Sequence, residues 1–170
     1  HHWVPLYDYP NDRATFECKL TVDKDLHAIS NGELVSKTDN TDGTHTFHWK
    51  ENYPMVSYLI SFAVGNYVKV EDAYKDLPVN YWVYPENQHE AHRSFGKTTD
   101  MLEYFNKMTG VDYPFEKYDQ VIISDFMWGG MENITLTHNT DRTMHDSKAQ
   151  PDHSSDGLVA HELAHQWYGD

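Results

Sequence analysis

Two histidines four residues apart near the end of the chain could hold one metal ion. The stretch 159–167 contains the pattern H-E-x-x-H, formed by His161, Glu162 and His165. Residues four apart on an α-helix lie on the same face, so both imidazoles can point at one ion. Glu162 lies on the neighbouring face, where it can reach a water molecule held by that ion. The pattern is typical of two zinc ligands plus a general base. A surface helix with two solvated histidines is the alternative.

The helix that must position these side chains also carries an apolar stripe. Its members follow the spacing i, i+3, i+4, i+7 of a core-facing surface: Ala160, Leu163, Ala164 and Trp167. Burial of this stripe would fix the direction of the two histidines. Ser154, Ser155 or Asp156 is available as the N-cap of the helix.

A second group of residues, Trp128–Asn133, lies between two expected strands, 118–123 and 134–137. Gly129 and Gly130 let the backbone approach a ligand closely, and Glu132 places an acid at a strand edge. A glycine bulge beside a solvated carboxylate is the other interpretation of the same residues.

Together the two motifs resemble the aminopeptidase N family of zinc metallopeptidases. The segment Gly129–Asn133 reads G-G-M-E-N, which fits the family's exopeptidase signature G-x-M-E-N, and H-E-x-x-H is its zinc motif. Other similar stretches extend the resemblance over essentially the whole chain: Trp3–Pro10, Ala28–Gly32, Val159-Ala160 and Gln166-Trp167.

The resemblance implies a role for each motif residue. It places zinc on His161 and His165, makes Glu162 the general base, assigns the substrate's free α-amine to Glu132, and lines the peptide cleft with Gly129, Gly130 and Met131. The implied partners are peptides with a free N-terminus, because a carboxylate that binds an ammonium selects against a blocked one. The implied activity is release of N-terminal amino acids by water attack at zinc.

The resemblance also implies that a piece of the site is missing. The family's third zinc ligand is a glutamate on a later helix, and its oxyanion-stabilising tyrosine lies further on, whereas this chain ends at Asp170. We therefore expect a fragment that binds zinc weakly and lacks catalysis alone. His138, His145 and His153 could complete the site, although the polar sequence around them favours solvated side chains.

Two other functions stay open at this point. A leukotriene hydrolase of the same family also carries G-G-M-E-N, so an epoxide hydrolase activity is compatible with the motif. A non-catalytic relative that binds peptides or partners is the second. The joint presence of His161, Glu162, His165 and Glu132 argues against it, because a binding protein has no need of a general base.

Alternating apolar residues predict a β-rich first part, up to about residue 70. Strands are expected at 16–22, 58–64 and 67–70, and hairpins at Asn31-Gly32 and Asp42-Gly43. After residue 70 the pattern changes to a strand at 79–84, a helix at 88–109 that stops at Gly110, and the strands named above. We therefore expect a β-rich, saddle-like N-terminal domain in residues 1–70, and the first part of an α/β thermolysin-like catalytic domain in 71–170.

Composition narrows the class of protein further. The net charge of −14 argues against nucleic-acid partners, and no apolar run is long enough to span a membrane. The lone Cys18 excludes a disulfide framework and a cysteine metal site. The chain does not begin with methionine and shows no signal-like segment, so we expect a soluble piece of a longer protein whose compartment, cytoplasmic or exported, is not decided.

Overall fold

The computed structural model describes residues 3–169, which form three β-sheets and three α-helices. Strands β1 (Arg13–Asp23), β4 (Thr44–Val56) and β3 (Glu33–Asp39) make the first sheet, in that order and antiparallel. The turn at Asp42-Gly43 joins β3 to β4, and Gly43 has a φ of +89°, which confirms the second expected hairpin.

The hairpin expected at Asn31-Gly32 is wrong. Strand β2 (His27–Ser30) pairs with β5 (Phe62–Gly65), while β3 pairs with β4, so the two strands beside the turn belong to different sheets. Gly32 lies so close to the backbone of Lys50 that a β-carbon would overlap it. The buried Asn31 side chain is used for contacts with other segments. Tertiary packing therefore overrides the local turn signal.

The largest sheet is mixed and has the strand order β6-β7-β8-β10-β9. Its strands are β6 (Val68–Tyr74), β7 (Leu77–Val83), β8 (Tyr118–Ile123), β10 (Leu136–Thr140) and β9 (Gly130–Met131). The three central strands run parallel, and β6 and β9 are antiparallel at the edges. Residue 70 lies inside β6, and the division of the chain near that residue stays a prediction.

The helix expected over 88–109 is divided. A 3₁₀ turn, η2 (Pro85–Glu90), leads into α1 (Ala91–Phe95), and α2 (Thr98–Thr109) follows. Gly96 disfavours helix, and the Thr98 hydroxyl donates a hydrogen bond to the Phe95 carbonyl at 2.6 Å, which ends α1. The expected stop at Gly110 is confirmed by its left-handed φ of +70°. The segment expected as one strand over 58–64 begins instead with a short 3₁₀ turn, η1 (Ser57–Leu59), before β5.

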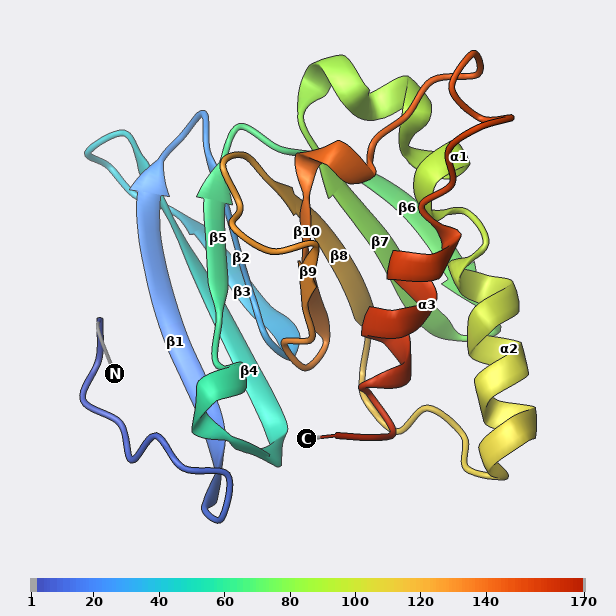
Figure 1. The fold of residues 1–170 in the computed structure, drawn as a ribbon. Coiled ribbons are helices and arrows are strands. Elements are labelled where there is room, and N and C mark those ends of the chain that lie inside the picture. The colour runs from blue at the N-terminus through green and yellow to red at the C-terminus, as the bar shows by residue number, and fades with distance from the viewer. Residues whose placement is uncertain (1–2, 170) are drawn as a thin grey trace.

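The large sheet is covered on both faces (Figure 1). Helices α1, α2 and α3 (Asp156–Ala164) lie on one face, where Phe95, Leu102 and Leu163 pack against Tyr81 and Tyr118 of the sheet. The other face packs against the β1-β4-β3 sheet and the two-stranded β2-β5 sheet. This contact forms a second core cluster, which includes Ala28, Ile29, Phe47, Trp49, Trp82, Val121 and Leu136. The structure is thus β-rich with few helices, as expected. Across residues 3–169, every helix is too short or too polar to cross a membrane.

Candidate metal and peptide site

Helix α3 carries His161 and Glu162 and begins close to the expected position. It ends at Ala164, and His165 is its C-cap residue, still in a helical conformation. Ser155 is its N-cap residue, and the Ser154 hydroxyl accepts a hydrogen bond from the Asp156 amide at 3.2 Å. The Lys97 ammonium forms an ion pair with Asp156 at 2.5 Å, and its hydrogen bond to that carboxylate lowers the pKa of Asp156. The negative side chain in the first turn also suits the helix dipole.

The apolar stripe of α3 differs in one position from the expected one. Val159 and Leu163 are buried in the core, at 1% and 0% exposure, and Ala164 and Trp167 pack against the same cluster. Ala160 is only half-buried and lies outside that cluster, so the correct stripe starts one residue earlier. The stripe fixes the rotation of the helix, which leaves His161 on the exposed side.

The imidazoles of His161 and His165 face each other. Their Nε2 atoms are 3.3 Å apart, and the ring centroids are 5.0 Å apart with an angle of 77° between the planes. Two nitrogens on a tetrahedral zinc, each about 2.0–2.1 Å from the metal, lie roughly 3.4 Å apart. The spacing and the donor type therefore fit a shared zinc ion.

A contact outside the pair orients the second histidine. The Nδ1 atom of His165 donates to the Tyr168 carbonyl at 3.2 Å. This bond places the ring hydrogen on Nδ1 and leaves the Nε2 lone pair for a metal, the usual outer-shell arrangement for a histidine ligand. Gly169, with φ of +97°, turns the chain directly against this ring, where a β-carbon would lie 2.9 Å from Nδ1.

No third histidine, cysteine, aspartate or glutamate joins the pair within residues 3–169. The expectation that His138 and His145 are solvated is wrong. His145 is 6% exposed and its ring contacts Ser94 and Gln150, at 3.2 and 3.1 Å. Burial lowers the pKa of His138 to about 4. Both side chains belong to the packed interior, while His153 is exposed, as expected.

The G-G-M-E-N segment forms the edge of the large sheet beside α3. Gly130 and Met131 make up β9, and the Gly129 carbonyl accepts a hydrogen bond from the Thr140 amide at 2.9 Å. The pairing of β9 with β10 is regular, without the bulge considered from the sequence. Gly130 lies directly against the side chain of Glu162, so that a β-carbon there would overlap the carboxylate. The two motifs are therefore in contact.

An open hollow of about 550 Å³ is lined by both motifs. Its walls include five of the seven expected site residues: Gly129, Gly130, Met131, His161 and Glu162. Glu162 is 4% exposed. Its negative charge contributes, after burial, to a raised pKa of Tyr118 in the neighbouring strand. The hollow thus combines an imidazole, a buried carboxylate and bare glycine backbone.

The other two expected residues lie beside this hollow. Glu132 directly follows Met131 and is partly buried. His165 lines a second hollow of about 320 Å³, together with Gln166 and Trp167. Leu158 and Trp128 also line the first hollow, although neither was expected as a site residue. The only signal for Trp128 is an aromatic residue directly before the glycines, and its side chain is 68% exposed.

This arrangement defines a candidate metal and peptide site, and comparison with known proteins places it in a family. Residues 93–170 match the family model described as the peptidase family M1 domain, and residues 1–59 match the peptidase M1 N-terminal domain. The chain belongs to the peptidase M1 family, which confirms the resemblance to the aminopeptidase N family.

Several curated proteins are similar over nearly the whole chain. Glutamyl aminopeptidase of Homo sapiens is 31% identical over 170 residues, which cover 97% of this chain and 18% of that protein. Aminopeptidase 2 of Candida albicans is 32% identical over 174 residues, which cover 98% of this chain and 18% of that protein. Endoplasmic reticulum aminopeptidase 1 of Mus musculus is 30% identical over 170 residues, which cover 97% of this chain and 18% of that protein. The chain therefore spans less than a fifth of the length of these relatives.

Proposed function

We propose that the full-length protein is a zinc-dependent aminopeptidase that releases N-terminal amino acids from peptides. The observation that carries this proposal is the single hollow lined by His161, Glu162 and the glycines of G-G-M-E-N. Membership of the peptidase M1 family and the aminopeptidase names of the relatives support the same reaction class.

In this proposal His161 and His165 hold the zinc ion through their Nε2 atoms. The 3.3 Å spacing of these atoms and the bond from His165 Nδ1 to the Tyr168 carbonyl support it. When bound, zinc would polarise the scissile carbonyl and acidify a water molecule. A catalytic zinc site usually has three protein ligands, and residues 3–169 bring only two together. The third, a glutamate in the family, is proposed to come from elsewhere in the protein.

Glu162 is proposed as the general base. Its carboxylate would take the proton of the attacking water and pass it to the leaving amine. The side chain is buried against Gly130 at one wall of the hollow, so its freedom to rotate is small. A proton acceptor fixed in this way keeps its geometry during the reaction.

Glu132 is proposed to bind the substrate's free α-amine, and the backbone of Gly129, Gly130 and Met131 to line the peptide cleft. A carboxylate and an ammonium form a charge-assisted hydrogen bond, which an N-acetylated peptide cannot form. The absence of side chains at Gly129 and Gly130 leaves room for an extended peptide beside β9.

We further propose that residues 1–70 belong to a saddle-like β domain and residues 71–170 to the first part of a thermolysin-like catalytic domain. The two matched family models cover the chain in this order, and they leave residues 60–92 between them. Activity is expected from the full-length protein and not from this chain alone.

The test compares an aminoacyl anilide with its N-acetylated counterpart in the full-length protein, with and without a zinc chelator. We expect cleavage of the free amine only, abolished by the chelator. Glu132→Ala should lower kcat/KM about 100-fold, the scale for losing one partner of a charge pair. Glu103→Ala on the exposed face of α2 removes a surface carboxylate as the matched control and should leave kcat/KM unchanged.

Equal cleavage of both anilides would remove the aminopeptidase assignment and keep a zinc peptidase. No cleavage of either substrate by zinc-loaded protein would favour the peptide-binding relative or an epoxide hydrolase.

A further inference from the structure

The side chain of Gln166, which directly follows the second histidine, connects the metal-binding helix to the G-G-M-E-N segment. It is 7% exposed. Its Nε2 donates to the Glu132 carbonyl at 3.2 Å, and its Oε1 accepts from the Thr135 amide at 3.1 Å. The Tyr113 hydroxyl donates to the same Oε1 at 3.4 Å. One amide therefore holds both ends of residues 132–135.

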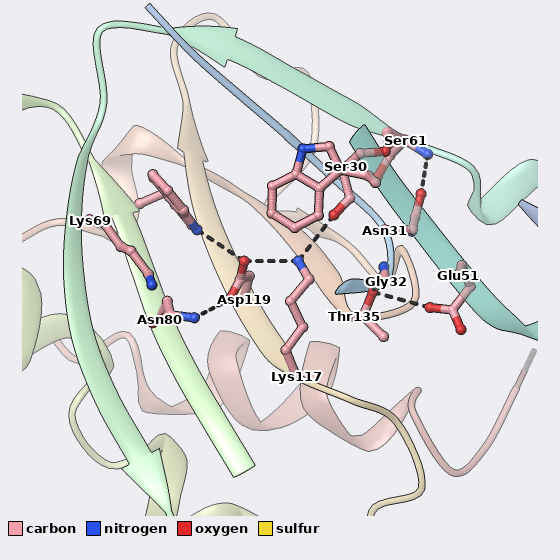
Figure 2. A network of polar contacts seen from close by, with 12 residues as sticks. Ser30, Asn31, Gly32, Glu51, Ser61, Lys69, Asn80, Lys117, Asp119 and Thr135 are labelled. Carbon is pink, nitrogen blue, oxygen red and sulfur yellow. Dashed lines mark hydrogen bonds and ion pairs between the residues drawn. The ribbon is translucent and has the colours of Figure 1, made fainter. Parts of the chain in front are cut away.

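Thr135 marks a strained point at the end of this segment. Its φ of +62° lies in the left-handed region, which a β-branched residue rarely adopts. Such a conformation persists only where the surroundings hold it. The hydroxyl of Thr135 accepts from the Gly32 amide at 2.7 Å and donates to Glu51 at 3.4 Å (Figure 2).

Asn31, which lies between β2 and β3, holds the other side of the same segment. The Asn31 amide donates to the Ile134 carbonyl at 2.6 Å and to the Leu59 carbonyl at 3.1 Å. Its oxygen accepts from the Ser61 amide at 2.7 Å (Figure 2). Asn133 also donates to the Leu59 carbonyl, at 3.1 Å. Residues 132–135 are thus fixed from two directions.

We infer that Gln166 is a positioning residue that sets the separation between Glu132 and the metal-binding histidines. The inference rests on the proposed function and names a residue that would act through the backbone of Glu132. Gln166 is covalently next to His165 and hydrogen-bonded to Glu132, so its amide links the second histidine to the backbone of the proposed amine anchor. A fixed distance between the Glu132 carboxylate and the metal would allow only one substrate residue between the bound α-amine and the scissile bond. An enzyme that removes single N-terminal residues requires this spacing.

The side chains of Asn31 and Thr135 brace this link. Without the Gln166 amide, the Glu132 carbonyl and the Thr135 amide would each lose a buried partner. The contacts from Asn31 and Gly32 would still hold the Thr135 end, so the Glu132 end of the segment would be the part free to shift. A displacement of about 1 Å of a substrate-binding group is enough to change rates about 100-fold.

The test uses the full-length protein with Gln166→Met, which keeps the side-chain length and removes the amide. Gln120→Met is the matched control, because Gln120 is a fully buried glutamine whose amide donates to Thr98 of α2 at 2.8 Å. Its backbone lies opposite Thr137 in β10, so the control is compared at the Thr135 amide. Zinc content, KM and kcat for the free and acetylated anilides, and hydrogen exchange of residues 130–137 are measured.

We expect Gln166→Met to keep its zinc, to raise KM for the free anilide about 30-fold, the scale of two lost buried hydrogen bonds, and to speed exchange of the Thr135 amide. Gln120→Met should change neither. Thr135→Ser keeps the hydroxyl and should resemble the wild type, whereas Thr135→Val loses it and should share part of the KM effect.

Unchanged KM together with unchanged exchange in zinc-loaded Gln166→Met would overturn the inference. A wild type that fails to cleave the free anilide would instead overturn the proposed function. The exchange data would then still decide whether Gln166 positions the segment.

Discussion

Gly130 has no room for a side chain, because Glu162 occupies the space where a β-carbon would be. A β-carbon at Gly130 would lie 2.6 Å from Glu162 Cγ and still closer to the carboxylate. Carbon atoms in contact are ordinarily about 3.5–4.0 Å apart, so Gly130→Ala must move one group by roughly 1 Å. Glu162 is 4% exposed and cannot simply swing into solvent. Gly130 has no positive φ, so alanine adds no backbone strain to this clash.

A displacement of about 1 Å at the general base should lower kcat about 100-fold, or about 2.7 kcal/mol of transition-state stabilisation. The assay is hydrolysis of the free aminoacyl anilide by the full-length Gly130→Ala protein, with zinc content measured in parallel. Gly157→Ala is the matched control, since Gly157 lines the same hollow and a β-carbon there meets nothing within 4 Å. Wild-type kcat in Gly130→Ala, or equal losses in both variants, would refute this reasoning.

Three predictions concern buried ionisable groups of the full-length protein. Burial raises the pKa of Glu51 from 4.5 to about 7, so its contribution to the free energy of unfolding is lost as pH rises from about 4.5 to 7. Glu51→Gln has no carboxyl group to titrate, so denaturant titrations of this variant should show a smaller fall in the free energy of unfolding over the same pH range. Burial lowers the pKa of His138 from 6.5 to about 4, so its contribution is lost as pH falls from 6.5 to 4; an imidazole NMR titration with a midpoint near 6.5 would contradict this. Lys117→Met should lower the free energy of unfolding by about 3–5 kcal/mol, because it leaves the buried Asp119 carboxylate, 2.8 Å from the Lys117 ammonium, without its partner. Adding Asp119→Asn should recover part of this loss, and no recovery in the double variant would count against a paired charge.

The sequence predicted those features of the structure that depend on residues close together in the chain. The i, i+4 spacing of His161 and His165 brought their imidazoles together, and the β-branched residues of Tyr118–Ile123 predicted a strand where one is observed. Gly110 ended α2 in a left-handed conformation, as its position after the apolar periodicity predicted.

The remaining features depend on contacts between segments far apart in the sequence. Asn31-Gly32 carries a strong hairpin signal. The Asn31 side chain, however, donates to the Ile134 carbonyl, and the Gly32 backbone amide donates to the Thr135 hydroxyl. Polar neighbours suggested a solvated His145, which instead packs against Ser94. The contact of Gly130 with Glu162 follows from β9 lying beside α3, and no spacing along the chain reveals it.

The most direct test of the account is a crystal structure of the full-length Glu162→Gln protein with zinc and a tripeptide. We predict one zinc ion about 2.0–2.1 Å from Nε2 of both His161 and His165, and the peptide α-amine within hydrogen-bonding distance of the Glu132 carboxylate. A metal bound elsewhere, or a peptide that runs past Glu132 with its amine in solvent, would contradict the proposed site.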